Sequence, residues 1–237
     1  MAGGRHPDRV AVLAPMVSEL RAVVKAFSLQ RGDVGGLPAH TGGLGDVEIV
    51  AVKIGMGTST AAAATERLLD AVTVDHVLVV GIAGGVVEGV EIGEMIFPSR
   101  VVDHASGTEF IPAGLAPGEA SGTLLTSDSF FVEPGEIDEL ARRGVVGLDM
   151  ETAAVAAVCE RRECDWSVVR SVSDRPGDVP AEVLELAGAD GTPNLGKAVG
   201  YMVRRPGRVP GLARLARNSQ RAANRAAAAA VVACTRR

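Results

Sequence analysis

Three stretches of this 237-residue chain are apolar almost from end to end and about as long as a β-strand. They are residues 9–14 (RVAVLA), 76–85 (HVLVVGIAGG) and 166–174 (WSVVRSVSD). A strand that is apolar on both faces has to be covered on both, which is typical of parallel and mixed sheets between helices. Helical patterns at 54–72 and 151–162 separate these stretches. The sequence therefore predicts the α/β class: a single domain with a central mixed β-sheet flanked by helices.

Shorter elements complete the expected domain, which spans residues 9–185. We expect a helix at 18–27 and further strands at 38–43, 47–53, 94–103 and 122–127. A Gly- and Pro-rich turn is expected at 32–38, because these residues break both helix and strand patterns. Residues 104–121 are expected to form a surface loop that carries His104.

The C-terminal residues 186–237 differ from this domain in charge. The chain as a whole has a formal net charge of −5, yet residues 191–237 contain ten basic and no acidic residues. Their composition is helical, with breaks expected at Pro206 and Pro210. We expect a basic helical C-terminal extension that packs on or next to the domain.

One face of this extension carries a stripe of arginines. Arg214, Arg217, Arg221 and Arg225 recur at steps of three and four residues, which places them on one side of a helix. A solvated stripe on a packing helix is the favoured interpretation. The alternative is a basic amphipathic helix that makes a weak contact with an anionic membrane surface. The weak apolar face and the absence of aromatic residues argue against that alternative.

Composition excludes several classes of function. The acidic domain and an aromatic content of only 3% argue against a nucleic-acid partner. Cys159, Cys164 and Cys234 have no CxxC spacing, which favours reduced thiols in a cytoplasmic protein. The four histidines are scattered, so no metal site and no cofactor is expected. The N-terminus is polar, and no apolar run reaches the roughly 20 residues that span a bilayer.

Polar and glycine residues gather where the predicted strands end. In open α/β sheets, ligands bind outside the carboxyl ends of the strands. Four segments leave such ends, and one helix start joins them: residues 15–19, 55–60, 81–85, 173–174 and 149–151. Together they provide four carboxylates, several bare backbone amides and few cations.

The glycines among these residues allow two interpretations. Gly55 and Gly57 precede a helix and leave backbone amides that suit an anion or a hydroxyl group, although tight strand–helix packing is the favoured explanation. Gly81, Gly84 and Gly85 allow a planar ligand to approach the backbone closely, or they simply form a turn.

The charged residues allow two interpretations as well. Glu151 could accept hydrogen bonds from a vicinal diol or only compensate a helix dipole. Asp174 could share a proton with a ligand nitrogen or only form a turn. Glu19 could be a general base or a first-turn helix acid. Arg170 lies inside a buried strand, so it requires a carboxylate partner in either case.

Together these segments resemble the purine nucleoside phosphorylase/nucleosidase superfamily. The motifs are APMVSELRAVV (14–24), IGMGTSTAAAA (54–64), VVGIAGGV (79–86), TSDSFF (126–131), VGLDMETAAVAAVC (146–159) and VVRSVSD (168–174), in the order seen in that superfamily. The chain is most similar to the 5′-methylthioadenosine/S-adenosylhomocysteine nucleosidases, over residues 9–185. The combination of the DMETA and VRSVSD motifs is the specific part. The resemblance implies the superfamily's α/β fold, a homodimer, and cleavage of an N-glycosidic bond to adenine.

The resemblance also implies roles for individual residues. Asp174 would protonate N7 of the leaving base, and Glu19 would activate the attacking water. Arg170 would orient the carboxylate on the water side. These roles fit the chemistry, because a protonated base leaves more readily and carboxylates stabilise an oxocarbenium-like sugar.

Further residues would bind the substrate, a purine nucleoside. Glu151 would hold the ribose 2′- and 3′-hydroxyls while Met150 packs against the sugar. Phe130 would stack near the base, and the backbone of Phe131 would read the edge of the base. Ser173 would support Asp174, while Gly55, Ile82 and Gly84 would line the site through the glycine turns.

Water is favoured over phosphate as the nucleophile. A phosphorylase needs arginine side chains that hold phosphate. In hexameric relatives one such arginine precedes the glycine turn, where this chain has Leu78-Val79-Val80. Arg21 could supply only a single contact. The reaction class implied is therefore hydrolysis, with phosphorolysis less favoured.

Two departures from the family pattern leave alternatives open. Ile82 stands where the family usually has Ser or Thr, which would fit a catalytically weak nucleoside-binding module. Residues 188–223 are longer and more basic than the usual closing helix. They are similar to the ending of the hopanoid-associated nucleoside phosphorylases, which act on an adenosyl-lipid and also tolerate an apolar residue in the glycine turn.

Overall fold

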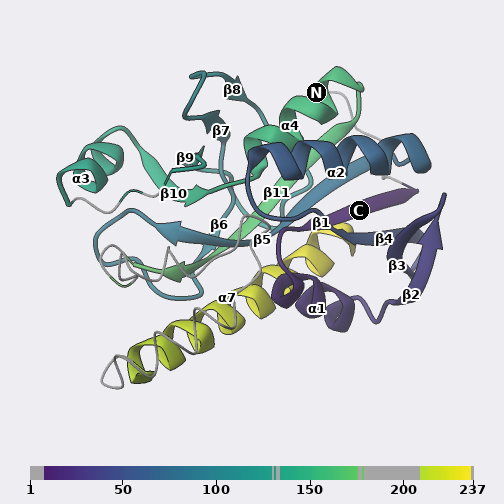
Figure 1. Ribbon diagram of the computed structural model, residues 1–237, viewed down its shortest axis with the longest axis horizontal. Helices are drawn as coiled ribbons and strands as arrows, with labels where there is room; N and C mark the ends of the chain where they lie inside the picture. The colour runs from purple at the N-terminus through teal and green to yellow at the C-terminus, as the bar shows by residue number, and fades with distance from the viewer. Residues whose placement is uncertain (1–7, 130, 132–133, 176–177, 179–208, 236–237) are drawn as a thin grey trace.

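The computed structural model describes residues 8–129, 131, 134–175, 178 and 209–235, and these residues form one sheet covered by helices on both faces (Figure 1). The strands are β1 Arg9–Ala14, β2 Gln30–Val34, β3 Leu37–Leu44, β4 Val47–Lys53, β5 His76–Gly85, β6 Met95–Ile96, β7 Arg100–Asp103, β8 Glu109–Phe110, β9 Thr123–Thr126, β10 Val145–Asp149 and β11 Asp165–Asp174. The helices are α1 Val17–Ala26, α2 Thr58–Ala71, α3 Pro134–Arg142, α4 Thr152–Arg161 and α7 Val209–Thr235.

The sheet is mixed, and β5 is its central strand. Its main path is β2-β3-β4-β1-β5-β10-β9-β7-β8, and β11 pairs with β5 and β6. The pairs β1–β4, β1–β5 and β5–β11 are parallel, whereas β10 is antiparallel to β5. The predicted single α/β fold with a central mixed sheet is confirmed.

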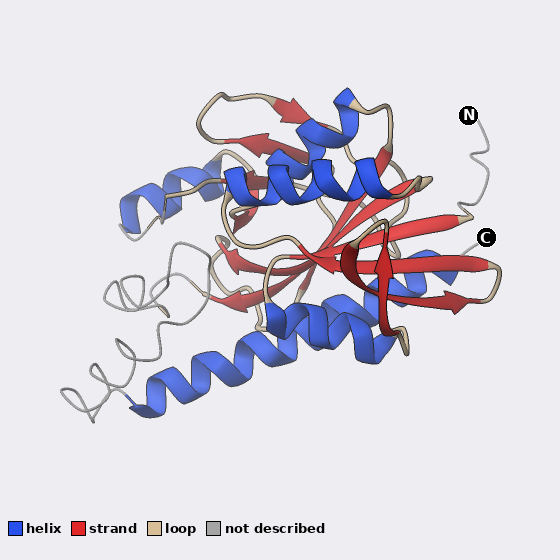
Figure 2. Ribbon diagram, turned by 45° about the vertical axis from the view of Figure 1, so that its right-hand side comes forward, coloured by secondary structure: helices blue, strands red, loops and turns tan. Residues whose placement is uncertain are grey.

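Each face of the sheet has its own hydrophobic core. Side chains alternate along each buried strand, so Ala11 and Leu13 of β1 join α2 and α4, whereas Val10 and Val12 join α1 and α7. Figure 2 shows the resulting layers, with the red strands between two pairs of blue helices. Both faces of the central strands are thus covered, as their continuous apolar sequence requires.

A turn and a strand differ from the sequence expectation. The turn expected at 32–38 is only the pair Gly35-Gly36, both with positive φ, and β2 pairs with β3 up to Val34 and Leu37. Two glycines are the favoured connection of a two-residue hairpin, so the strands extend directly to them. The strand expected at 94–103 is interrupted around Pro98, which has no N–H for the ladder.

The helix α7 begins before Pro210 rather than after a break at it. Pro210 is the second residue of the helix, where its missing N–H would have no partner. Pro206 lies outside the described residues. The alanine-rich face of the second half of α7 is buried against the sheet and α1 at Ala222, Ala223, Ala226, Ala227 and Ala230. The first half of α7 projects beyond the sheet (Figure 1), and the four arginines of the stripe are exposed.

Membrane contact by this stripe stays a prediction. Among the residues that the structure describes, no helix is both long and apolar enough to span a bilayer.

The buried imidazole of His76 predicts a fold that weakens in acid. His76 Nε2 lies 2.8 Å from Ser167 Oγ. Burial lowers the pKa of His76 to about 4, with Asp165 acting in the opposite direction. The unfolded chain binds this proton near pH 6.5, so the free energy of unfolding falls as the pH falls from about 6.5 to about 4. Between pH 7 and 4.5 the free energy of unfolding, measured with urea, should fall by about 2 kcal/mol less in the His76→Gln variant than in the wild type.

The difference between the two proteins isolates this histidine, because every other titrating group is common to both. His104 is exposed on a loop, and His104→Gln is the matched control. Equal acid losses in the wild type and His76→Gln would show that another group causes the sensitivity.

Candidate active site

A pocket of about 250 Å³ opens at the carboxyl ends of β1, β5, β10 and β11. The ends of these strands bring most of its walls together, as expected for an open α/β sheet. The lining residues are Pro15, Met16, Glu19, Met56, Ile82, Ala83, Gly84, Gly85, Ser127, Ser129, Phe131, Ile137, Leu148, Asp149, Met150, Glu151, Ser173, Asp174 and Arg175.

Most of the residues predicted from the sequence lie on this lining. It includes Glu19, Ile82, Gly84, Phe131, Met150, Glu151, Ser173 and Asp174. Arg170 lies buried beneath it. Gly55 is not part of the lining; a Cβ there would meet Thr60 at 2.4 Å, so this glycine allows the turn to pack on α2. Its neighbour Met56 lines the pocket instead. Phe130 lies outside the described residues.

Glu19 is fixed from two sides at the start of α1. Its carboxylate accepts hydrogen bonds from the backbone N–H groups of Met16 and Ile82, each at 2.8 Å. The bond from Met16 is the part of a capping box that places an acid in the first helical turn. The residue is 2% exposed. Burial raises the pKa of Glu19, and the charge of Arg170 opposes that rise.

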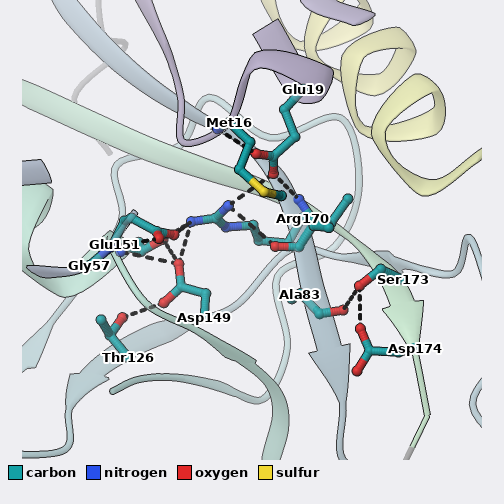
Figure 3. A network of polar contacts seen from close by, with 12 residues as sticks. Met16, Glu19, Gly57, Ala83, Thr126, Asp149, Glu151, Arg170, Ser173 and Asp174 are labelled. Carbon is teal, nitrogen blue, oxygen red and sulfur yellow. Dashed lines mark hydrogen bonds and ion pairs between the residues drawn. The ribbon is translucent and has the colours of Figure 1, made fainter. Parts of the chain in front are cut away.

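Arg170 is the only cation within this buried cluster of described residues, and it faces three carboxylates (Figure 3). Its Nη2 group donates to Asp149, lies 3.4 Å from Glu151 and donates to Thr152 Oγ1 at 2.9 Å. Its Nη1 lies 4.0 Å from Glu19 Oε1. The expectation that a buried arginine requires carboxylate partners is met.

The charges in this cluster do not balance. One guanidinium faces the carboxyl groups of Glu19, Asp149 and Glu151, and a buried excess of negative charge is unfavourable. Burial accordingly raises the pKa of Glu151 to about 8; the charge of Arg170 opposes this rise, whereas the nearby Asp149 and Glu19 add to it. The excess of negative charge in this cluster therefore favours a proton on one of its glutamates near neutral pH.

Glu151 is placed by a backbone contact across the pocket. It is the N-cap of α4, and its Oε1 accepts a hydrogen bond from the N–H of Gly57 at 3.2 Å. The glycine turn before α2 therefore contributes an amide to this carboxylate. Glu151 is 4% exposed and lines the pocket, and its second oxygen, Oε2, accepts a long hydrogen bond from Arg170 Nη2 at 3.4 Å.

Asp174 stands at the end of β11, beside a bulge. The register of β11 on β5 shifts between Val172 and Asp174. Ser173 Oγ donates a hydrogen bond to Asp174 Oδ1, and Ser173 Oγ also lies 3.3 Å from the carbonyl oxygen of Ala83. Burial raises the pKa of Asp174, so this carboxyl keeps its proton to a higher pH than a free aspartic acid and can still donate it.

Two of the three glycines of β5, Gly81 and Gly84, leave room for these acids. A Cβ on Gly81 would lie 2.3 Å from Glu19 Oε1 and 2.4 Å from Arg170 Nη1, and a Cβ on Gly84 would lie 3.3 Å from Asp174 Oδ2. The missing side chains at Gly81 and Gly84 therefore make room for Glu19, Arg170 and Asp174.

Sequence reasoning gave Asp149 no role, although it is the tightest partner of Arg170. Its Oδ1 accepts from Thr126 Oγ1 at 2.6 Å, and its Oδ2 accepts from the N–H of Thr152 at 3.1 Å. The available signal was the Asp-x-x-Thr spacing at the start of α4, which is typical of a side chain that caps a helix.

The acids on this lining can act on a molecule bound in the pocket. A protonated Asp174 can donate to a leaving group, and carboxylates can activate water or stabilise positive charge that develops in a transition state. Glu19, Glu151 and Asp174 line one pocket, so one molecule can touch all three.

Comparison with known proteins places the chain in a family. The model of the phosphorylase superfamily matches residues 9–120 and 115–197. The chain belongs to this superfamily. Among its relatives, the 5′-methylthioadenosine/S-adenosylhomocysteine nucleosidase of Chromohalobacter salexigens is 28% identical over 200 residues, covering 71% of this chain and 85% of the relative.

Solved structures of superfamily members share the fold. The nucleosidase of Neisseria meningitidis, in complex with methylthio-immucillin-A, has a TM-score of 0.72 at 20% identity and covers 95% of this chain and 98% of its own. The nucleosidase of Colwellia psychrerythraea, in complex with adenine, has a TM-score of 0.73 at 20% identity, with coverage of 96% and 95%. The fold similarity thus extends over almost the whole chain.

Proposed function

We propose that this protein is an adenine-releasing nucleosidase, an N-glycosyl hydrolase that acts on 5′-substituted adenosines of the methylthioadenosine/S-adenosylhomocysteine type. The observation that carries this proposal is that Glu19, Glu151 and Asp174 come from three different elements and line one pocket. The names of the relatives at 28% identity support the same reaction.

Each acid would act at a different place on the nucleoside. Asp174 protonates N7 of adenine, so that the base leaves as a neutral molecule. Glu19 accepts a proton from the attacking water. Glu151 accepts hydrogen bonds from the ribose 2′- and 3′-hydroxyls, and its charge stabilises the oxocarbenium-like sugar. Arg170 would hold Glu19 and Glu151 in place from beneath the pocket.

The rest of the lining would bind the apolar parts of the substrate. Met150 packs against the sugar, and the backbone of Phe131 reads the edge of the base. Ser173 supports Asp174 through its hydroxyl. Gly84 and Ile82 form the wall along β5, and the N–H of Ile82 is engaged by Glu19. Stacking by Phe130 remains part of the proposal from the sequence.

Hydrolysis is preferred to phosphorolysis because the lining is acidic. Among its described residues, Arg175 is the one cationic side chain, and Arg170 beneath the pocket is already surrounded by carboxylates. A phosphate beside the sugar would share this lining with four carboxyl groups, without the arginine clamp that such an anion needs.

Adenine release from methylthioadenosine, S-adenosylhomocysteine and 5′-deoxyadenosine, with and without inorganic phosphate, tests the proposal. We expect release at the same rate in phosphate-free buffer. Release that requires phosphate would make the protein a phosphorylase. Binding of these nucleosides without release would identify a catalytically weak nucleoside-binding module.

The exposed arginine stripe of α7 favours one second candidate, a hopanoid-associated phosphorylase or nucleosidase that acts on an adenosyl-lipid. In that case the stripe would make a weak contact with an anionic membrane surface. Adenine release from an adenosyl-lipid in anionic vesicles, but not from methylthioadenosine, would favour this candidate.

The proposal includes a cytoplasmic homodimer. The resemblance to the nucleosidases implies the dimer. Cys159, Cys164 and Cys234 are all free thiols, which fits a reducing compartment.

A further inference from the structure

The guanidinium of Arg170 is held unequally by its three acidic neighbours. Nη2 donates to Asp149 and to Thr152 Oγ1, the latter at 2.9 Å, and lies 3.4 Å from Glu151. Nη1 donates to the carbonyl oxygen of Ile82 at 3.3 Å and lies 4.0 Å from Glu19 Oε1, which is beyond hydrogen-bond distance. Among the three acids, Arg170 is therefore held most closely by Asp149, and it touches Glu19 only as a longer ion pair.

The anchor itself is rigid. Asp149 is the last residue of β10, is buried, and accepts bonds on both of its carboxylate oxygens. Thr126 Oγ1 donates to Oδ1 at 2.6 Å and in turn accepts the N–H of Ala153 at 3.0 Å. The N–H and the hydroxyl of Thr152 both donate to Oδ2. This carboxylate is thereby fixed between β9 and the start of α4.

We propose that Asp149 is a positioning residue that draws Arg170 toward Glu151 and thereby keeps the guanidinium out of hydrogen-bond contact with Glu19. The inference rests on the proposed function, in which Glu19 accepts a proton from water. A glutamate in direct contact with a guanidinium is a weak base, because the charged form is stabilised. At 4.0 Å, the guanidinium still orients Glu19 without removing its basicity.

The charged groups around Glu19 come from three elements packed against it and from the pocket lining. Arg170 comes from β11, Asp149 from β10 and Glu151 from the N-cap of α4, and Asp174 and Arg175 line the same pocket. No histidine is among the described residues of the lining. Burial raises the pKa of Glu19 and Arg170 opposes the rise, while Asp149 adds to it.

The competing explanation is that Asp149 only caps α4. Asp149→Asn separates the two, because asparagine keeps an oxygen for the N–H of Thr152 but loses the charge that attracts Arg170. We expect kcat/KM for methylthioadenosine to fall about tenfold, and the acid limb of the pH–rate profile to move down by about one pH unit. Both the approach of Arg170 to Glu19 and the loss of a negative neighbour act in this direction.

Thr152→Val tests positioning without a change of charge. Its hydroxyl contacts both Asp149 and Arg170, so its loss loosens the anchor. The acid limb should again move down, by a smaller amount. This variant also decides the question if Asp149→Asn does not fold. Asp128→Asn is the matched control, since Asp128 is a carboxylate near the pocket that bonds Thr58 and not Arg170.

An acid limb that stays at its wild-type pH in folded Asp149→Asn or Thr152→Val would overturn the inference and leave only the capping role. Movement in Asp149→Asn alone would overturn positioning in favour of a direct charge effect. A wild-type protein that releases no adenine would instead contradict the proposed function.

Discussion

Replacement of Asp174 by asparagine should lower the rate of adenine release by a factor of about 10² to 10⁴, with nucleoside binding largely retained. Asparagine has nearly the same shape, and its oxygen can still accept the hydrogen bond from Ser173 Oγ. Its amide group can also donate a hydrogen bond to a ring nitrogen of the base. It cannot transfer a proton, so only the step in which adenine leaves is affected.

The pH dependence of the rate should change in the same variant. Because burial raises the pKa of Asp174, this acid stays protonated at a higher pH than a free aspartic acid. The wild-type rate should fall as the pH rises through this raised pKa, since the proton donor is lost. The alkaline limb should be absent in Asp174→Asn. The kcat and KM for methylthioadenosine across the pH range, with calorimetric binding, measure both effects.

Asp178→Asn is the control for this substitution. Asp178 lies on the same segment, where its side chain accepts the N–H of Arg175, but it is not part of the pocket lining. Its loss should change the rate only a few fold. If Asp174→Asn retains more than a tenth of the wild-type rate, Asp174 is not the acid.

The fold could be predicted because its decisive feature is local in the sequence. Strands that are apolar on both faces require helices on both sides, and β1, β5 and β11 meet this requirement with helices α1, α2, α4 and α7. The N-terminal hairpin was missed in part because β2 is exposed and polar, so it carries no apolar signal. Pairing with β3 through a Gly-Gly turn, and not burial, makes it a strand.

The candidate site could be predicted only as a set of separate acids. Strand ends indicated Glu19, Glu151 and Asp174, since each lies next to an apolar strand or at a helix start. The network beneath them depends on register across the sheet. Gly81 is the cross-strand neighbour of Arg170, and this pairing places the guanidinium over a position without a side chain. Nothing in the local sequence around residue 81 or 170 indicates that match.

This match makes Gly81→Ala the most informative substitution outside the acids themselves. Gly81 has an ordinary strand backbone, so alanine is acceptable in conformation. Its methyl group, however, would lie 2.3 Å from Glu19 Oε1 and 2.4 Å from Arg170 Nη1, so both side chains must move. We expect adenine release to fall by a factor of about 100 or more, because general-base help is lost. Overpacking should lower the free energy of unfolding by about 1–3 kcal/mol.

Gly43→Ala is the matched control. It makes the same glycine-to-alanine change in a strand without a steric clash. Gly43 lies in β3, also without positive φ, and no atom lies within 4 Å of the position of its added Cβ. Its rate and its urea-unfolding midpoint should stay close to those of the wild type. A folded Gly81→Ala protein with more than a tenth of the wild-type rate would mean that Glu19 and Arg170 can separate without loss of function. The buried ion pair beneath the pocket would then have a structural role only, and the water-activating group would have to be sought elsewhere on the lining.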